Sequence, residues 1–367
     1  MSTAIAQCWT SISRFHDPRM APTIETAETY EAEGWDGVRY PDTQSIAPEM
    51  FVVLSAIAQR TQRIHFSSGV AVPLTRHPAV MASGFAALQE SSGGRANLVI
   101  GRGDTALAHI GLSPTRLRYL ERYIRHLKTY LEGGSIPLAE AAPTMEGAVH
   151  GFDDLAAGHF PPASALVWMD RDVPRVPIEV AATGPKAIQM AGRVADRVAL
   201  FLGADRERIA WAIDLARGAA EQAGRDPGEL SFSAYVPISV VDADISAERA
   251  KELMMPFVMA GSRFRVMDRE VRGAASDHER TVLESIRDSY DINQHAKSTQ
   301  GRASVDDEYL DSYAIVGEPA YCLDRLQDIA ELGVDRFSMM FSTPDQPEHE
   351  EVRGRLVHHI LPVLQGR

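Results

Sequence analysis

The chain has only two cysteines, Cys8 and Cys322, among its 367 residues. Cysteines this far apart do not form the closely spaced pair of a zinc or redox motif, so we expect two reduced, buried thiols and no metal site. The sequence also lacks the roughly 18 uninterrupted apolar residues that a membrane-spanning helix needs. Its first residues, MSTAIAQCWTSISRFHD, lack the basic start and long apolar stretch of a secretory signal. These absences predict a cytoplasmic protein without a membrane partner.

Basic residues are scarce relative to acids. The chain has 37 lysines and arginines against 50 aspartates and glutamates, a net charge of −13. Such a charge repels nucleic-acid phosphates unless a local basic patch overrides it, and the sequence shows no such patch. Apolar residues make up 45% and charged residues 24% of the chain, which is typical of a globular enzyme. We therefore expect a small-molecule substrate and no nucleic-acid partner.

Eight short β-rich runs alternate with helical patterns. The expected strands are residues 4–9, 37–40, 64–72, 97–101, 177–181, 197–202, 232–241 and 336–341. Eight strand–helix units joined by parallel crossovers close into a barrel. The sequence therefore predicts an α/β protein, a single (β/α)8 TIM barrel over residues 1–367.

Two of the intervening helices are visible in the spacing of their apolar residues. The first has Pro48 in its first turn and one apolar face, formed by Met50, Val53, Leu54 and Ile57. The second should end before Gly333, and its face is formed by Leu323, Leu326 and Ile329. Residues 133–176 and 245–313 do not fit the repeat, and we expect both to be insertions over the barrel mouth.

Two aspartates follow predicted strands and should face the carboxyl-terminal mouth, where barrel active sites lie. Asp42 stands in GVRYPDTQ, and Asp104 ends GRANLVIGRGD, in which an apolar run opens into a glycine turn. Because glycine lets a backbone approach a ligand closely, this junction suits a cofactor mouth. Each aspartate could move a proton or bind a ring nitrogen, and each could instead cap the helix that follows it.

The end of the third strand is rich in small residues. Residues 67–80 read SSGVAVPLTRHPAV. Small residues there either leave room for a flat ring or let the strand pack tightly on its helix. His77, at the start of the next helix, is expected to cap that helix or to face solvent.

The segment AATGPK, residues 181–186, has the features of an anion site. Thr183 and Gly184 turn the chain, and Pro185 is preorganised for the first helical position. Lys186 adds a cation at the positive end of that helix. The turn predicts a phosphate site, with a Thr-capped helix that binds no ligand as the alternative.

The chain resembles the luciferase-like monooxygenase superfamily over nearly its whole length, in the order and spacing of EAEGWDGVRYPD, RIHFSSGVAVPLTRHPAV, SGGRANLVIGRGD, VPIEVAATGPKAIQMAGRVAD and SYAIVGEPAYCLDRLQDIAELGVDRF. The RGD, the ATGPK turn and the segment YDINQHA are more similar to its deazaflavin-dependent branch, around methylenetetrahydromethanopterin reductase and its bacterial relatives. The resemblance implies a barrel with insertions, usually a homodimer. Its cofactor would be coenzyme F420, or flavin mononucleotide (FMN) as in other branches, with the ring at the barrel mouth.

The resemblance also implies roles for individual residues. Gly69 and Val70 match a bulged strand with a non-prolyl cis peptide behind the ring. Asp42 matches an acid that lines the ring pocket and Asp104 an acid close to the reacting face, which makes these two the expected catalytic residues. The expected cofactor contacts are Asp42, Ser68, Gly69, Val70, Ala71, Gly101, Gly103, Asp104, Ala182, Thr183, Gly184, Pro185, Lys186, Phe201 and Leu202. The residues expected to face the substrate are Gln7, Trp9, Tyr40, Arg102 and His109.

One position departs from the alcohol-oxidising relatives, which carry Asp-His where this chain has Asp42 and Thr43. Without that imidazole base, reduction of an activated C=C, C=N or C=O group is favoured. The first reading is thus an F420-dependent oxidoreductase that holds ring and substrate roughly 3 to 3.5 Å apart and excludes water. The second is an FMN monooxygenase that uses oxygen and a partner flavin reductase. The third is a non-catalytic barrel that binds a phosphorylated ligand or a protein partner.

Overall fold

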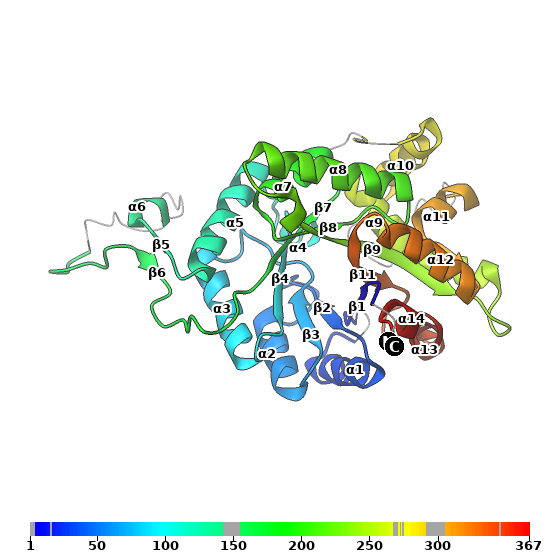
Figure 1. Ribbon diagram of the computed structural model, residues 1–367, viewed down its shortest axis with the longest axis horizontal. Helices are drawn as coiled ribbons and strands as arrows, with labels where there is room; N and C mark the ends of the chain where they lie inside the picture. Colours follow the sequence, from blue (N-terminus) through cyan, green and yellow to red (C-terminus); the bar gives the residue numbers. More distant parts are fainter. Residues whose placement is uncertain are drawn as a thin grey trace.

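Eight parallel strands form a closed barrel in the computed structural model (Figure 1), which describes residues 4–14, 17–141, 155–266, 271, 273, 275–290, 305–344 and 346–367. In barrel order the strands are β1 (Gln7–Ser11), β2 (Gly37–Tyr40), β3 (His65–Ser68), β4 (Ala96–Ile100), β7 (Ile178–Ala182), β8 (Arg197–Leu200), β9 (Ser231–Val240) and β11 (Val334–Met340). The pairing of β1 with β11, which sets Gln7 opposite Arg336, closes the ring. The predicted α/β TIM barrel is confirmed.

Each of the eight predicted strands is present, with bounds that differ by a few residues at most ends. The bounds of β2 are as predicted, whereas β3 ends at Ser68 because the following residues leave the ladder with β4. The prediction missed β10 (Ile315–Gly317), which pairs in parallel with the end of β9. It also missed the hairpin of β5 (Ser135–Ile136) and β6 (Ser164–Ala165). Strands this short contain too few residues to show a period.

The helices of the described residues for the most part surround the barrel and cover the outer faces of its strands (Figure 1). They are α1 (Met20–Glu33), α2 (Met50–Arg60), α3 (Pro78–Ser91), α4 (Asp104–Ala108), α5 (Leu117–Leu131), α6 (Leu138–Ala141), α7 (Pro185–Val194), α8 (Arg206–Gln222), α9 (Ala247–Phe264), α10 (Asp277–Ser289), α11 (Asp307–Tyr313), α12 (Pro319–Ala330), α13 (His349–His359) and α14 (Leu361–Leu364). The predicted apolar face of α2 is buried, but Pro48 precedes the N-cap residue Glu49 and lies outside the helix. As predicted, α12 ends before Gly333, whose φ of 102° is left-handed.

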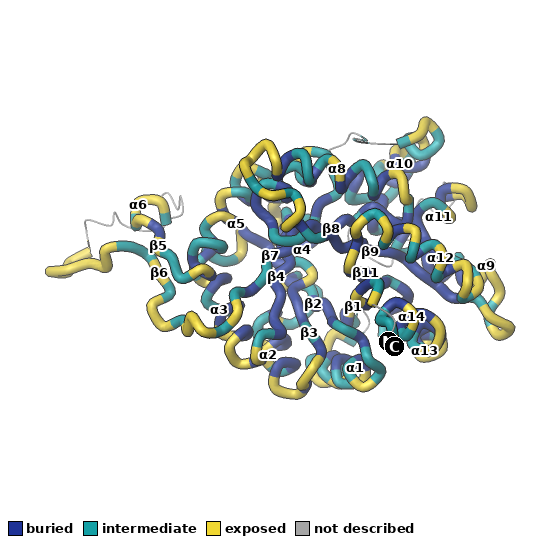
Figure 2. Tube along the Cα trace, in the orientation of Figure 1, coloured by how far each residue is buried: buried dark blue, intermediate teal, exposed yellow. Residues whose placement is uncertain are grey.

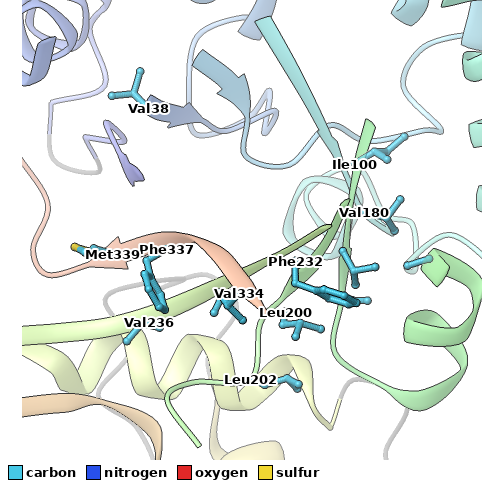
Figure 3. Packing of buried hydrophobic residues seen from close by; sticks show 14 of the residues in the cluster. Val38, Ile100, Val180, Leu200, Leu202, Phe232, Val236, Val334, Phe337 and Met339 are labelled. Atoms are coloured by element: carbon cyan, nitrogen blue, oxygen red, sulfur yellow. The ribbon is translucent and has the colours of Figure 1, made fainter. Parts of the chain in front are cut away.

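The apolar core lies between the strands and the helices. Strand residues alternate in direction, so every second residue of a strand points outward to this layer. Figure 3 shows this packing, and its labelled residues are Val38, Ile100, Val180, Leu200, Leu202, Phe232, Val236, Val334, Phe337 and Met339. The strands are buried along their length, while the outer faces of the helices are exposed (Figure 2).

The inside of the barrel is charged, in contrast to this apolar layer. Glu179 of β7 accepts hydrogen bonds from Arg39 of β2 at 3.0 Å and from Arg336 of β11 at 3.1 Å. It also accepts one from Ser233 of β9. Because these strands are not all neighbours, the four side chains meet across the barrel interior. The side chains of Arg39 and Glu179 are 3% exposed and that of Arg336 is 8% exposed, so the charges are almost fully removed from water.

The two expected insertions lie in different places. The described part of residues 133–176 runs along α3 and α5 and projects from the body as an arm (Figure 1), with Gln89 of α3 donating to the carbonyl of Pro174. This contact is near the end of α3 that is remote from the mouth, so the structure does not place that part of the arm over the mouth. Residues 245–313 include α9, whose last turn contacts the mouth. The segment YDINQHA falls largely outside the described residues.

Both cysteines are free and buried, as expected. Burial raises the pKa of the Cys8 thiol and raises that of Cys322 to about 12, which leaves both unreactive. Within the described ranges, no helix is long and apolar enough to cross a membrane. The same residues include no group of three or more His, Cys, Asp or Glu side chains that could hold a metal ion.

Candidate active site at the barrel mouth

The carboxyl end of β3 forms a bulge beside β4. The Ser68 hydroxyl donates to the carbonyl of Val99 at 2.7 Å and accepts from its N–H at 2.9 Å, in place of backbone partners. The ladder resumes at Ala71, whose N–H donates to the same carbonyl at 2.8 Å. Between them, Gly69 is exposed and the Gly69–Val70 peptide bond is cis. The bulge and the cis peptide implied by the resemblance are confirmed, and the structure leaves exposed backbone at this edge of the mouth.

The glycines of the RGD turn are explained by packing against this bulge. A Cβ on Gly101 would lie 2.9 Å from Cγ2 of Val70, and one on Gly103 would lie 2.5 Å from Cγ1 of Val72. Gly103 also has a φ of 74°, a backbone conformation that residues with a side chain rarely adopt. Both glycines are buried. Because these glycines have no side chain, the loops after β3 and β4 can pack together. The sequence alone suggests a different reason for the same glycines, the close approach of the backbone to a ligand.

Asp42 holds the loop that follows the bulge. Its Oδ2 accepts from the N–H of Val72 at 3.0 Å, and Nη1 of Arg76 lies 2.8 Å from both carboxylate oxygens. It does not cap α2, whose N-cap is Glu49. Burial raises the pKa of the Asp42 carboxyl, and the nearby Arg76 only partly opposes this. The expected capping role is therefore wrong, and the contacts make Asp42 an anchor for residues 72–76.

Asp104 is the first residue of α4 and forms an ion pair with Arg263 of α9. Nη2 of Arg263 donates to Oδ1 of Asp104 at 3.1 Å, and Nη1 pairs with Oδ2. The N-cap of α4 is Gly103, and no side chain caps this helix. The capping alternative is thus wrong for Asp104 as well. A guanidinium favours the carboxylate form of its partner, and a carboxylate accepts a proton or hydrogen bond and cannot donate one.

The turn before α7 is open at the N-terminus of that helix. Its N-cap is Gly184, with no capping side chain, and Pro185 occupies the first helical position as predicted. A Cβ on Gly184 would meet nothing within 4 Å, and Lys186 is exposed. The hydroxyl of Thr183 donates to the carbonyl of Phe264 at 3.2 Å, so the Thr-capped alternative is wrong. Free N–H groups, the helix dipole and a cation together can bind an anion here.

The last turn of α9 connects three loops of the mouth. Arg263 reaches Asp104 after β4, while the carbonyl of Phe264 accepts from Thr183 after β7. The Phe264 ring packs edge-on against Phe201 after β8, with ring centroids 5.3 Å apart. Phe201 in turn lies 4.4 Å from the ring of Tyr235. The second excursion therefore completes the rim of the mouth between β4 and β8.

The residues expected to face the substrate are spread over both ends of the barrel. Gln7 begins β1, and Trp9 pairs with Gly37 at the start of β2, so both lie toward the amino-terminal end. There the carboxamide of Gln7 accepts from Arg336 at 2.9 Å, and Arg336 lies over the Trp9 ring at 4.2 Å. Both residues precede the end of β1, so they do not stand at the strand end where they were expected, and their contact with a substrate stays a prediction.

The other three expected substrate residues belong to the mouth loops. Tyr40 is only 2% exposed, its hydroxyl donates to the carbonyl of Pro48 at 3.4 Å, and burial raises its pKa to about 12. Arg102 donates through Nε to the carbonyl of Thr115 at 2.8 Å. His109 follows α4 and is exposed. Of these, His109 and the half-buried Arg102 have surface to offer a ligand.

The expected cofactor contacts divide in the same way. Those with accessible surface are Gly69, Val70, Asp104, Thr183, Gly184, Pro185, Lys186 and Phe201. Those that are buried are Asp42, Ser68, Ala71, Gly101, Gly103, Ala182 and Leu202. The buried group supports the loops from behind, whereas the accessible group lines the mouth where β3, β4, β7 and β8 follow one another around the ring.

Sequence reasoning missed the residues that complete this site from a distance. Arg263 lies 159 residues beyond Asp104, and Arg76 lies 34 residues beyond Asp42. No local spacing links such pairs. Phe264, with its contacts to Thr183 and Phe201, was missed for the same reason.

Comparison with known proteins agrees with this geometry. The sequence pattern of the luciferase-like monooxygenase family matches residues 6–336. The chain is 26% identical over 339 residues to 5,10-methylenetetrahydromethanopterin reductase of Methanolobus tindarius, covering 89% of this chain and 91% of that protein. Its fold is similar to that of the coenzyme F420-dependent tetrahydromethanopterin reductase of Methanopyrus kandleri, with a TM-score of 0.70, 21% identity and coverage of 99% and 100%. It is also similar to the FMN-bound oxygenating constituent of 3,6-diketocamphane monooxygenase from Pseudomonas putida, with a TM-score of 0.65, 16% identity and coverage of 97% and 98%. The chain belongs to the luciferase-like monooxygenase family.

Proposed function

We propose that the protein is a coenzyme F420-dependent oxidoreductase that acts on a small organic substrate at the barrel mouth. The observation that carries this proposal is the pairing of two features on one rim. The exposed Gly69 in the bulge leaves backbone uncovered after β3, and the open N-terminus of α7 offers an anion site after β7. A ring cofactor with a phosphate needs both. The likeness to F420-dependent reductases favours the deazaflavin over FMN.

The residues present fit such a cofactor. A Cβ on Gly184 would meet nothing within 4 Å, so the N-terminus of α7 is open there, and Lys186 is exposed next to it. Asp42, through Arg76 and Val72, would keep the bulge in place behind the ring. When bound, the deazaflavin supplies the hydride chemistry. The protein's share is to hold the substrate against the ring and exclude water, for which Phe201 and Phe264 provide apolar walls.

Asp104 is the proposed catalytic residue. It lies on the rim between the bulge and the α7 turn, and its side chain is 10% exposed. Thr43 stands where an imidazole base would favour alcohol oxidation, so we propose reduction of an activated C=C, C=N or C=O group. Residues 245–313 would supply the substrate side of the mouth through α9. We further propose a cytoplasmic homodimer, and light scattering of the purified protein would then give twice the mass of the 40.2 kDa chain.

Titration of the purified protein with F420 and with FMN tests the cofactor. Quenching of cofactor fluorescence measures binding, and an oxygen electrode measures oxygen uptake with each reduced cofactor. We expect saturable binding of F420, with FMN at least about tenfold weaker, and no oxygen uptake beyond the autoxidation that free reduced FMN shows without protein. Preferential binding of FMN with oxygen uptake would instead make the protein a monooxygenase, and binding of neither would leave the barrel without redox chemistry.

A further inference from the structure

The contact between Asp104 and Arg263 engages the whole carboxylate. Both oxygens of Asp104 face the guanidinium fork, one through Nη2 at 3.1 Å and the other through Nη1. The side chains are 10% and 16% exposed, respectively, so little water screens the pair. On its other side, the guanidinium lies 5.0 Å from the centroid of the Tyr290 ring, which limits its movement.

We propose that Arg263 is a positioning residue that keeps Asp104 ionised at the barrel mouth, so that this carboxylate acts as an acceptor and not as a proton donor. This inference rests on the proposed function in one respect only, namely that the reaction takes place at the barrel mouth. The ion pair itself is a property of the protein without any ligand.

The chemistry of the two groups supports this assignment. A guanidinium has five N–H donors and no acceptor. A protonated Asp104 would direct an O–H toward those donors, whereas the carboxylate accepts from Nη2 at Oδ1 and forms an ion pair with Nη1 through Oδ2. Burial lowers the pKa of Arg263, but an arginine stays charged in proteins at any ordinary pH. The contact therefore favours the ionised form of Asp104, and an arginine beside an aspartate typically lowers the acid's pKa by about 1 to 3.

The other charged groups near α4 are engaged elsewhere or face solvent. Arg102, two residues before Asp104, donates through Nε to the carbonyl of Thr115. His109, at the far end of α4, is exposed. Arg76, from the β3 loop, is bound to Asp42 and Glu49. From the α9 side, Arg263 is thus the cation in contact with Asp104, with Tyr290 as the titratable group behind it.

An ionised Asp104 limits the proton-coupled steps that the mouth can perform. In the oxidising direction, the carboxylate takes the proton of a substrate O–H or N–H while the neighbouring C–H bond breaks and its electron pair leaves with the hydride. In the reducing direction, the hydride adds to the substrate carbon and any proton needed at the neighbouring atom comes from water. Asp104 then orients the substrate and compensates positive charge on it.

The pKa of Asp104 can be measured directly in the ligand-free protein. Protein labelled with ¹³C at the aspartate side-chain carboxyl carbons is titrated by NMR, and Asp104→Asn assigns the signal. We expect Asp104 to titrate below the ordinary value of about 3.9 for an aspartate. In Arg263→Met, which keeps the length of the side chain but removes its charge, the acid dissociation constant should fall at least about tenfold. In Arg263→Lys, which keeps the charge, it should fall less.

Arg249→Met is the matched control, because Arg249 is on the same helix and pairs with Glu252 and Glu348 at the surface. It should leave the Asp104 signal unchanged. An Asp104 that titrates at or above about 3.9 in the unmodified protein overturns the proposal, even if Arg263→Met does not fold. An unchanged pKa in a folded Arg263→Met also overturns it. Failure of F420 to bind would refute the proposed function but not this result, since the titration uses no cofactor.

Discussion

The buried charges inside the barrel give a prediction that depends on one carboxylate. Glu179 is shared by Arg39 and Arg336, and all three side chains are less than a tenth exposed. Replacing it by glutamine keeps the shape but removes the negative charge. Two guanidiniums would then face one another across the barrel with no counterion, which is among the costly changes that a protein interior can undergo.

The magnitude follows from the pKa of Glu179. Burial alone would raise it, but the charges of Arg39 and Arg336 outweigh burial and lower the pKa from 4.5 to about 2. A fall of this size corresponds to about 3 kcal/mol of stability at neutral pH, at about 1.4 kcal/mol for each tenfold change. We therefore expect Glu179→Gln to lower the free energy of unfolding by about 3 kcal/mol at pH 7, within the usual range for a broken buried pair.

The sign of the pH dependence is fixed by the direction of the shift. A carboxyl whose pKa is lower in the folded state stabilises the protein above its unfolded pKa and loses that contribution as the pH falls toward the folded value. The difference between the parent protein and Glu179→Gln should thus be full above pH 4.5 and shrink as the pH falls from 4.5 to about 2. Urea unfolding followed by circular dichroism, at several pH values, measures it.

Two further variants distinguish the loss of a buried charge pair from nonspecific destabilisation by a substitution. Burial lowers the pKa of Arg336 to about 10, so this cation is costly to keep inside, and Arg336→Met leaves one cation matched to one anion. It should cost less than Glu179→Gln. Glu28→Gln removes the half-buried partner of the exposed Arg60 and should cost at most about 1 kcal/mol. A loss below about 1 kcal/mol for Glu179→Gln at pH 7, or an equal loss at pH 7 and pH 3, would refute the reasoning.

Three other predictions concern the mouth. Gly184→Leu should weaken cofactor binding about tenfold or more, because the leucine side chain enters the open space at the N-terminus of α7 where the phosphate would bind. Thermal stability should change little, since that space holds no other atoms within 4 Å of the added Cβ. Unchanged affinity in the titration would place the phosphate elsewhere. Asp42→Asn should weaken cofactor binding, because Arg76 keeps only Glu49 as a carboxylate partner and the loop loosens. The melting temperature should change little, since burial already raises the pKa of the Asp42 carboxyl, and equal affinity would show that the loop needs no anchor. Asp104→Asn should bind cofactor normally and slow single-turnover hydride transfer by about tenfold to a hundredfold, because a charge-assisted hydrogen bond that orients the substrate is lost. An unchanged rate would remove Asp104 from the chemistry.

The barrel was predictable because its signals are local. Alternating strand and helix patterns identify eight units, and the predicted bounds of β2, residues 37–40, are those of the structure. The end of β3 was not predictable in the same way. Ser68 replaces a backbone partner with its own hydroxyl, so the ladder stops although the sequence continues with residues typical of a strand.

The aspartates of the mouth show what local reasoning cannot decide. An aspartate after a strand and before a helix is expected to cap that helix, because the nearest unpaired N–H groups are there. Asp42 and Asp104 instead bind arginines that are distant in sequence. A guanidinium offers two charged donors to one carboxylate, which a capping N–H cannot match. The position of each aspartate follows from the sequence, but its partner follows from the fold.

The charged barrel interior, by contrast, has a signal in the sequence that can be read once the barrel is recognised. Arg39, Glu179 and Arg336 each stand inside a predicted strand, where a charge has no place in the outer apolar layer. Since strand side chains alternate, such a residue must point into the barrel, and opposite charges on different strands must then meet there. Charged residues within barrel strands therefore predict an interior network, just as glycines and acids at the strand ends predict a mouth. Because this network pairs two cations with one anion, it carries a net positive charge beneath the mouth.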